Sequence, residues 1–365
     1  MIRPRALGLA LGALVVLGCA PAKPPERWQA IPVATDAEFT GVWFADSLHG
    51  WLAGSGWAID GGIVGRTRDG GHTWSFESGI VPGGDRGSGL ARIQFRDSLR
   101  GWATADQGEV LLTADGGETW RPVPLPGRGG FLHALQFRDD AEGWVGGTQI
   151  AHTEDGGETW HVQFRSESEN GYVTANAIHF VDPSRGWLVG QGATLMRTDN
   201  GGTDWTAVRL PLVENEHPTL WDITFADGAQ GWIAGDGGVI FHTANGGATW
   251  ERQEQGVPVV RALPAGEPPR HDVRPELEIE PDRLTLMSIR FADTRHGWAV
   301  GYYADVAESV VLATADGGAT WSVDRVQPGE ELRSLFVLDR DHVWAAGRRS
   351  RREPQVVLRY SGRGD

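Results

Sequence analysis

Cysteine and lysine are almost missing from this chain of 365 residues: each occurs once, as Cys19 and Lys23. A lone cysteine excludes an intramolecular disulfide and a metal site built from cysteine thiolates. The eleven histidines form no His-x-His or His-x-x-x-His pair, so we expect neither a metal nor another cofactor. Acidic residues outnumber basic ones by 48 to 33, which gives a formal net charge of −15. Such a surface repels phosphate backbones, and this argues against a nucleic-acid partner.

Long apolar runs are scarce as well. The apolar stretch near the N-terminus, residues 7–17, is too short for a comfortable transmembrane helix, which needs about 20 residues. It follows Arg3 and Arg5, and this order of basic and then apolar residues predicts a secretory signal over residues 1–18. Residues 19–27 (CAPAKPPER) predict a proline-rich tether that holds the folded part of the chain away from a membrane.

The end of this signal, residues 16–19 (VLGC), resembles a bacterial lipobox. The resemblance implies that Cys19 is diacylated and becomes the new N-terminus of an exported, lipid-anchored protein of the bacterial cell envelope. Ala20 follows the cysteine, which in Gram-negative lipoproteins of this kind indicates the periplasmic side of the outer membrane. The alternative is a plain signal peptide that is cleaved nearby, with Cys19 incidental.

Glycine and tryptophan, by contrast, are abundant, with 52 and 17 copies, and many of them fall in two repeated phrases. The phrase Thr-x-(Asp/Asn)-Gly-Gly-x-x-Trp, an Asp box, begins at Thr67, Thr113, Thr153, Thr198, Thr243 and Thr314. A second phrase runs from Phe to Gly-Trp over residues 44–51, 95–102, 137–144, 180–187, 225–232 and 291–298, with a worn copy over 337–344. Repetition at a period of roughly 40–45 residues indicates a repeat architecture.

Each repeat can be divided into four strands, with the Asp box at the hairpin turn before the fourth. An Asp or Asn side chain accepts hydrogen bonds from turn N–H groups, and two glycines supply positive φ angles. The tryptophan that ends the box buries its ring against a neighbouring sheet. We therefore assign structural roles to Asp69, Asp115, Asp155, Asn200, Asn245 and Asp316, and to Trp74, Trp120, Trp160, Trp205, Trp250 and Trp321.

The Asp box occurs six times and the Phe to Gly-Trp phrase seven times, and this difference predicts how the ring closes. The last repeat ends without a fourth strand, and residues 28–33 (WQAIPV) resemble the fourth strands of other repeats. We expect an all-β, single seven-bladed β-propeller over residues 28–361, closed by pairing of residues 28–33 with the last blade. The predicted blades cover about 40–78, 90–126, 131–165, 174–212, 219–254, 284–326 and 331–361, and a proline-rich charged insertion covers 253–284.

The phrases FxDxxxGW and TxDGGxTW resemble those of the photosystem II stability/assembly factor-like propellers, within the Asp-box (BNR) repeat, sialidase-like group. The resemblance covers nearly all of residues 28–361. It implies a non-enzymatic assembly factor that binds a protein and that occurs in bacteria as a lipoprotein. The photosynthetic members bind through an arginine patch. This chain is acidic, and we do not equate its dense basic run with that patch: Arg348, Arg349, Arg351 and Arg352.

Irregular sequence gathers on one face of the predicted propeller. If the first strand of each blade is innermost, the Asp-box turns share one face, and the long links over residues 55–62, 302–309 and 348–355 share the other. Function in closed β-scaffolds concentrates on such loops and at the mouth of the central channel. The residues four before each repeat phenylalanine, with the matching residue of the worn copy, are expected to line that mouth: Thr40, Ala91, His133, Asn176, Trp221, Met287 and Arg333.

Aromatic residues outside the two phrases add possible anchors for a protein or a sugar, although they would serve equally well to pack the loops onto the disc. Together with the mouth and the basic run, they give the candidate binding residues Trp57, His133, Tyr172, Asn176, Trp221, Tyr302, Tyr303, Arg333 and Arg348. We predict that these residues bind a partner and that none of them is catalytic.

The favoured function is a monomeric, non-catalytic, protein-binding propeller of the cell envelope that aids assembly or stability of a membrane or envelope complex. The alternative is a carbohydrate-binding or sialidase-like glycoside hydrolase propeller. A sialidase-like site needs an arginine triad, a Tyr–Glu pair and an Asp. The sequence offers Tyr172 near Glu167 and Glu169, and Tyr302 and Tyr303 near Asp305 and Glu308, as such groups.

Overall fold

The computed structural model describes residues 27–56, 58–81, 83–84, 88–127, 130–165, 174–253, 260–261, 278–279, 283–305, 307–349 and 355–362. No helix in these ranges is long and apolar enough to cross a membrane. Several sequence-based expectations fall outside them: the signal over 1–18, the lipidated Cys19, most of the insertion over 253–284, and the candidate binding residues Trp57 and Tyr172.

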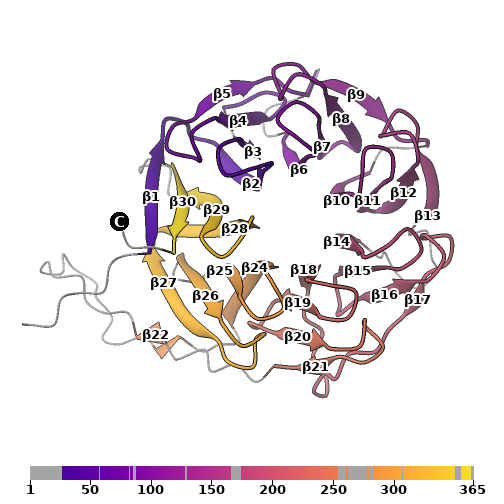
Figure 1. Cartoon of the computed structure of the whole chain (residues 1–365), viewed down its shortest axis with the longest axis vertical. Helices are drawn as coiled ribbons and strands as arrows, with labels where there is room; N and C mark the ends of the chain where they lie inside the picture. The colour runs from indigo at the N-terminus through magenta and orange to yellow at the C-terminus, as the bar shows by residue number, and fades with distance from the viewer. Residues whose placement is uncertain are drawn as a thin grey trace, which may run out of the picture.

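In the described part of the chain, seven four-stranded antiparallel sheets stand around a central channel (Figure 1). Each sheet is one blade, and its first strand lies nearest the channel. A separate two-stranded sheet pairs β22 (Val260–Arg261) with β23 (Glu278–Ile279). The prediction of an all-β, seven-bladed propeller is confirmed.

The strands of the blades have the following bounds. Blade 1 contains β2 (Glu38–Phe44), β3 (Gly50–Ser55), β4 (Ile63–Thr67) and β5 (Ser75–Ser78). Blade 2 contains β6 (Leu90–Phe95), β7 (Gly101–Ala105), β8 (Glu109–Thr113) and β9 (Arg121–Pro124). Blade 3 contains β10 (Leu132–Phe137), β11 (Gly143–Gly147), β12 (Gln149–Thr153) and β13 (His161–Arg165). Blade 4 contains β14 (Ala175–Phe180), β15 (Gly186–Gly190), β16 (Leu195–Thr198) and β17 (Thr206–Ala207).

Blade 5 contains β18 (Leu220–Phe225), β19 (Gly231–Gly235), β20 (Ile240–Thr243) and β21 (Glu251–Arg252). Blade 6 contains β24 (Leu284–Phe291), β25 (Gly297–Tyr303), β26 (Glu308–Thr314) and β27 (Ser322–Pro328). Blade 7 contains β28 (Glu330–Val337), β29 (His342–Arg349) and β30 (Gln355–Ser361), with β1 (Trp28–Val33) as its outer strand.

The ring closes through β1. It pairs antiparallel with β30 from Trp28 opposite Tyr360 to Val33 opposite Gln355, as the sequence predicts. Trp28 is buried, its ring lies 5.2 Å from that of Tyr360, and its Nε1 donates to Asp324 Oδ2 of blade 6 at 2.7 Å. The strand therefore covers an edge that would otherwise be exposed, and it joins the beginning of the chain to its end.

A cluster of three aromatic rings explains why Phe, Gly-Trp and the box tryptophan recur together. In blade 2, Phe95 lies against Gly101 on the paired strand, where a Cβ would sit 2.6 Å from the phenylalanine ring. Trp51 of blade 1 stacks face to face on Phe95 with ring centroids 3.6 Å apart, and Trp120 of the Asp box meets the same ring edge-on. One such aromatic cluster fastens neighbouring blades at six of the seven seams, the exception being the seam between blades 6 and 7.

The tryptophans of the Gly-Trp phrases also fix the Asp-box turns. Trp51 Nε1 donates at 2.9 Å to the carbonyl oxygen of Gly116, in the Asp box of the next blade. The same bond is made by Trp102, Trp144, Trp232 and Trp344. Two other tryptophans of these phrases have a buried Nε1 without a partner among the described residues: Trp187, although the next blade has an Asp box, and Trp298, which faces blade 7, where there is none. The turn and the neighbouring blade therefore support each other.

Inside the Asp box, the carboxylate organises the turn. In the third box, Asp155 Oδ1 accepts hydrogen bonds from Thr153 Oγ1 at 2.8 Å and from the Thr159 N–H at 2.9 Å. Gly156 and Gly157 have φ angles of 76° and 91°, which only glycine adopts without strain. Hydrogen bonds from the Thr159 side chain and backbone outweigh burial and lower the pKa of Asp155 to about 2. The structural role predicted for the box fits this geometry.

Replacing Asp155 with asparagine is expected to keep the turn but to weaken its response to acid. Asn200 already accepts the equivalent backbone N–H, from Asp204, at 2.9 Å. Because the pKa of Asp155 is depressed, its charge stabilises the fold above pH 4, and that contribution is lost as pH falls towards about 2. Urea unfolding at pH 7, 4 and 3 should show a shallower loss of stability in Asp155→Asn than in wild type. The difference should be no more than about 1 kcal/mol, because solvent screens this exposed carboxylate.

Asp155→Ala is the matched control, because it removes the acceptor and should cost about 1 kcal/mol already at pH 7. An identical pH profile for the wild type and Asp155→Asn would contradict the prediction.

Candidate functional site

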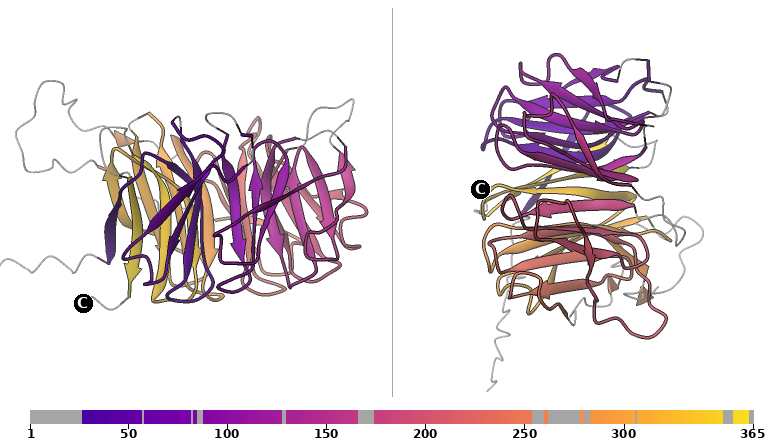
Figure 2. Two further views of the ribbon diagram at one scale, coloured as in Figure 1. Left: turned by 90° about the horizontal axis from the view of Figure 1, so that it is seen from above. Right: turned by 90° about the vertical axis from the view of Figure 1, so that its right-hand side faces the viewer.

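The two faces of the disc differ in character. Links between blades, and links from the second to the third strand, lie on one face, which we call the loop face. The Asp-box turns lie on the other, the Asp-box face; the left view of Figure 2 shows the loop face at the top and the Asp-box face at the bottom. The irregular sequence and the repeated turns are thus separated in space.

Every innermost strand carries a β-bulge near its beginning, at the same place in all seven blades. The pairing register shifts between Leu90 and Arg92 in blade 2, for example, so that Ala91 is the extra residue. A bulge re-aims a side chain and is a common device beside functional sites. The seven bulged residues are Thr40, Ala91, His133, Asn176, Trp221, Met287 and Arg333. These are the residues that the sequence places at the mouth.

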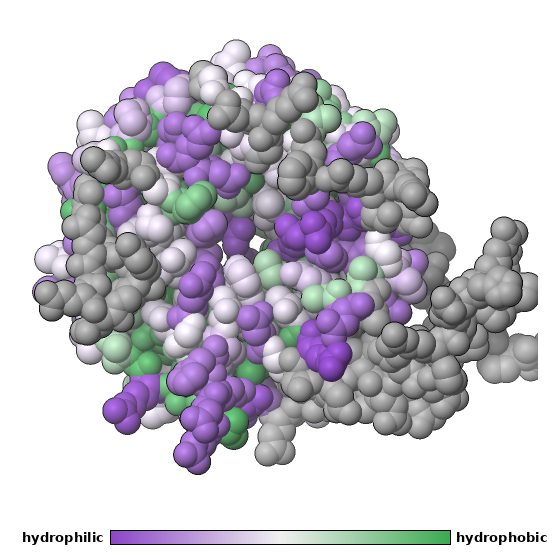
Figure 3. Space-filling model, turned by 180° about the vertical axis from the view of Figure 1, so that it is seen from behind, coloured by the Kyte–Doolittle hydropathy of each residue, from purple (hydrophilic) through white to green (hydrophobic). Residues whose placement is uncertain are grey.

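The structure brings all seven bulged residues together around one cavity of about 290 Å³ on the loop face, which we call the mouth. Arg92, Asp106, Thr174 and Gln191 complete its lining. Asp106 accepts the Gly89 N–H at 2.9 Å, and burial raises the pKa of its carboxyl. Figure 3 shows this face hollowed at its centre, with polar side chains around the opening. The binding role of these residues stays a prediction.

Two of the bulged residues hold neighbouring blades together through side-chain hydrogen bonds. The Thr40 hydroxyl donates to the carbonyl oxygen of Leu90 in the next blade. Asn176 Nδ2 donates to the carbonyl oxygen of Leu220 at 3.0 Å, and the Asn176 side chain is only 3% exposed. Asn176 is therefore an inter-blade clamp, and it exposes little of its side chain to a partner at the mouth.

The mouth offers partly exposed groups on opposite sides. Trp221 is half-buried, and its Nε1 donates to Asp236 Oδ1 at 2.8 Å, which fixes the indole at the rim. His133 is also half-buried, and its ring stacks near Phe131, which is 58% exposed. Burial, and then the charge of Arg92, lower the pKa of His133, so its imidazole is neutral at pH 7. The rim thus presents aromatic and neutral polar surface.

Arginines at the rim are tied to carboxylates. Arg348 donates to both oxygens of Glu331, at 2.8 and 2.7 Å, and to Glu38 at 3.4 Å. Arg333 also reaches Glu331, at 3.2 Å. The positive charge of both side chains is largely neutralised within the protein. Arg348 is thus part of an ion-pair network at the edge of the mouth.

Tyr303 does not lie where a surface anchor must lie. Its side chain is 1% exposed and belongs to the apolar core between blades 5 and 6, where it sits opposite Glu308 across β25 and β26. These two strands extend into the segment predicted as a long link over 302–309, so only residues 304–307 connect them. The expectation of an exposed Tyr303 is wrong. Tyr302, on the same strand, remains half-buried.

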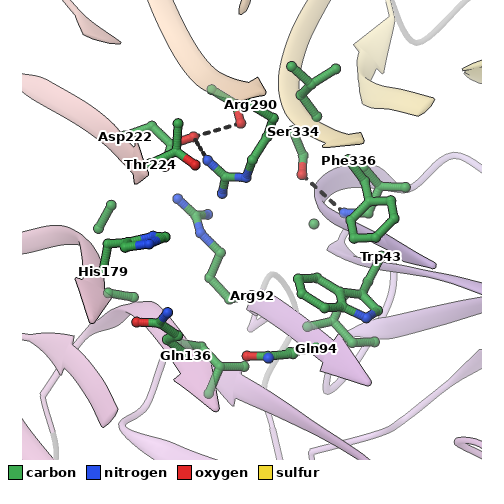
Figure 4. A pocket seen from close by; sticks show the side chains of 18 of the residues that line it. Trp43, Arg92, Gln94, Gln136, His179, Asp222, Thr224, Arg290, Ser334 and Phe336 are labelled. Carbon is green, nitrogen blue, oxygen red and sulfur yellow. Dashed lines mark hydrogen bonds and ion pairs between the residues drawn. The ribbon is translucent and has the colours of Figure 1, made fainter. Parts of the chain in front are cut away.

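Below the mouth, the channel opens into a cavity of about 470 Å³, which we call the channel cavity. It is lined by the residues three before and one before each repeat phenylalanine, because alternate side chains of an innermost strand point to the axis. Figure 4 shows Arg92, His179, Asp222 and Arg290 on one side and Trp43 and Phe336 on the other. These residues were missed from the sequence, although strand alternation applied to the repeat would have found their positions.

The charges in the channel cavity are arranged around Asp222. Its Oδ2 accepts hydrogen bonds from Ser288 Oγ at 2.8 Å and from the Ile289 N–H at 2.9 Å, and it forms an ion pair with Arg290. His179 lies nearby, and burial, followed by the charge of Arg290, lowers its pKa to about 4. The imidazole is therefore neutral at physiological pH. Among the described residues, no group of three or more potential metal ligands lies together.

Comparisons of the sequence and of the structure with known proteins point to the same family. The profile of a family described as "Photosynthesis system II assembly factor YCF48" matches residues 20–129, 85–167 and 170–270. The "Photosystem II assembly lipoprotein Ycf48" of Synechococcus sp. (strain CC9902) is 27% identical over 199 residues, which cover 48% of this chain and 57% of that protein. The match thus spans less than two thirds of that relative.

Solved structures share the fold. One described as "YCF48 bound to D1 peptide" is 19% identical with a TM-score of 0.66, covering 94% of this chain and 99% of that chain. YCF48 from Cyanidioschyzon merolae is 18% identical with a TM-score of 0.65, covering 92% of this chain and 98% of that chain. With the profile matched over most of the chain, these findings lead to one conclusion: the chain belongs to the YCF48 family of photosynthesis system II assembly factors.

Proposed function

We propose that this protein is a non-catalytic binding platform that assists assembly or stability of a membrane protein complex, and that the partner docks on the loop face over the mouth. The observation that carries the proposal is the set of seven bulges, which place one side chain from every blade around a single opening. A bulge repeated in all seven blades concentrates variable residues at one place on a rigid scaffold.

Relatives support the protein-binding role. A structural neighbour is described as bound to a D1 peptide, and the curated relative is named an assembly lipoprotein. For this chain, a membrane anchor through Cys19 and a protein partner at the mouth follow from the same proposal. The finer expectations, an outer-membrane location and a monomeric state, belong to it too.

Two observations favour binding over glycoside hydrolysis. Asp222, the carboxylate in the channel cavity, is held by three donors and compensates Arg290, so it is not free to act as an acid or base. The described lining of the mouth and of the channel cavity contains no tyrosine and no glutamate from which a Tyr–Glu nucleophile pair could be built.

Site-directed photo-crosslinking tests the docking face. A photoreactive amino acid in place of His133 or Trp221 should give a reproducible crosslink to one membrane-complex subunit in the native host. The matched controls replace Leu48 or Leu99, which are 52% and 56% exposed and lie at turns of the Asp-box face. Crosslinks to the same subunit from Leu48 or Leu99, with none from the mouth, would overturn the proposed face.

With that subunit purified, Trp221→Ala should weaken binding at least about tenfold while the melting temperature changes little, as for a buried aromatic anchor at an interface. Leu99→Ala should bind as the wild type does. Unchanged affinity in Trp221→Ala would remove Trp221 from the site.

A further inference from the structure

Arg92 lines both the mouth and the channel cavity below it, and its surroundings are unusual. It comes from blade 2 and reaches into the channel cavity on the same side as the Asp222–Arg290 ion pair of blades 5 and 6 (Figure 4). Its Nη1 donates only to backbone carbonyl oxygens, of Ala91 at 3.0 Å and Thr40 at 3.5 Å. No carboxylate among the described residues forms an ion pair with it.

The charge count in the channel cavity leaves one positive charge in excess. Arg92 and Arg290 are cationic, Asp222 is anionic, and His179 is neutral at pH 7. Arg138 and Arg333 also line this cavity, but Arg138 is paired with Glu142 at 2.9 Å and Arg333 with Glu331 at 3.2 Å. A guanidinium in a site of low dielectric is costly without a counter-ion, and here it occurs in a protein of net charge −15. The cavity is therefore suited to a single negative charge.

The channel cavity has room for more than a simple ion. At the level of Arg92 and Asp222, the other five innermost strands contribute only small residues: Gly41, Ala134, Ala177, Ser288 and Ser334. The resulting volume of about 470 Å³ lies within the range of small-molecule sites. The wall opposite the charges is apolar, with the rings of Trp43 and Phe336 4.8 Å apart.

Several other polar groups in the cavity are already in use. Gln94 Oε1 accepts the Phe137 N–H at 2.8 Å, and Gln94 Nε2 donates to the Phe137 carbonyl oxygen at 2.7 Å. Gln136 makes the same two hydrogen bonds with Phe180. Trp43 Nε1 donates to the carbonyl oxygen of Phe95 at 2.8 Å. The guanidinium of Arg92 therefore remains as the main donor for a ligand.

We propose that the channel cavity binds a monocarboxylate carried on an apolar body. The carboxylate pairs with Arg92, whose planar guanidinium suits bidentate recognition, and the apolar body lies against Trp43 and Phe336. One negative charge neutralises the single excess positive charge of the cavity. A phosphate dianion would bring one negative charge too many and would be repelled by Asp222. Arg92 also lines the mouth, but this proposal does not rest on the docking role of the mouth.

Calorimetric titration of the full-length protein tests the site with 3-phenylpropionate as the probe. The neutral isostere 3-phenylpropionamide and the dianion phenyl phosphate serve as comparison ligands. The acid should bind at least about tenfold more tightly than either. Arg92→Gln should weaken the acid at least tenfold, while Arg138→Gln, in the same cavity but at an arginine already paired with Glu142, should change it less than twofold. Circular dichroism should show both variants folded.

Equal affinity for the acid and the amide in the wild type would overturn the proposal, and this comparison does not depend on how any variant folds. Unchanged binding in a folded Arg92→Gln, or no binding of the acid at millimolar concentration, would overturn it too. A further titration distinguishes two sources of the carboxylate, a free small-molecule acid and a side chain of a partner protein. An acetylated peptide with one Glu between apolar residues should lose affinity in Trp221→Ala if it enters through the mouth, whereas 3-phenylpropionate should not.

Discussion

Replacing Trp232 with alanine is expected to lower the free energy of unfolding by about 3–5 kcal/mol. Trp232 is fully buried, its ring stacks on Phe291 of the next blade at 3.5 Å, and its Nε1 donates to the Gly317 carbonyl oxygen at 2.9 Å. The substitution removes apolar burial and the stack, and it leaves the Gly317 carbonyl oxygen with only the longer hydrogen bond from Gln253 Nε2, at 3.2 Å. Urea unfolding followed by circular dichroism measures the loss.

Trp298 provides the matched control within the chain. It occupies the same phrase position in blade 6, but blade 7 has Val337 where the other blades have phenylalanine. Trp298 meets only the edge of Tyr360 at 5.5 Å, and its Nε1 has no partner among the described residues. Trp298→Ala should therefore cost about 1–2 kcal/mol less than Trp232→Ala, since a stack and a hydrogen bond are already missing. Equal costs would show that inter-blade stacking adds nothing to simple burial.

Deleting residues 28–33 is the second change with a large expected effect. It removes the buried side chains of Trp28, Ile31 and Val33, each worth about 1.5–3 kcal/mol, and it exposes the edge of β30. We expect the melting temperature to fall by at least about 10 °C and the protein to associate through the open edge. Differential scanning calorimetry and light scattering measure the two effects.

A synthetic peptide of residues 27–34 added in trans is the control for this deletion. By pairing with β30 it should restore much of the melting temperature and suppress association, whereas a scrambled peptide should do neither. A deletion variant that melts as the wild type does would mean that ring closure contributes little to stability.

The propeller and its mouth were predictable because the chain repeats itself. A residue at a given offset from each phenylalanine must occupy the same place in every blade. The residues four before each phenylalanine, with the matching residue of the worn copy, therefore form a ring, and they are the seven bulged residues of the mouth. The same logic places the closing strand, because the unequal phrase counts show that one fourth strand is missing. Repetition thus converts a local pattern into a position in space.

Departures from the repeat were not predictable in this way. The strands β25 and β26 extend beyond their counterparts in other blades, and this extension carries Tyr303 into the core. Similarly, β29 continues to Arg349 and sets Arg348 against Glu331, in a segment that reads as a polar link. Polar composition alone does not show where a strand ends when a neighbouring blade supplies ion-pair partners.

The charges of the channel cavity were missed for a different reason. Arg92, Asp222 and Arg290 come from blades 2, 5 and 6, and each is a unique residue at a repeated position. The repeat gives their inward direction, but not which of them pair across a ring of otherwise small side chains. Only the three-dimensional arrangement shows that one guanidinium is left over.

The closing strand also determines where the two ends of the described chain leave the disc. Trp28 is paired with Tyr360, and the Ser361 N–H donates to the Arg27 carbonyl oxygen at 2.9 Å, so both ends of the described chain leave from the Asp-box face. Under the proposed anchor at Cys19, that face would be turned towards the membrane. The mouth would then point outward at the far side of the disc, where an incoming subunit could approach without passing between the propeller and the membrane.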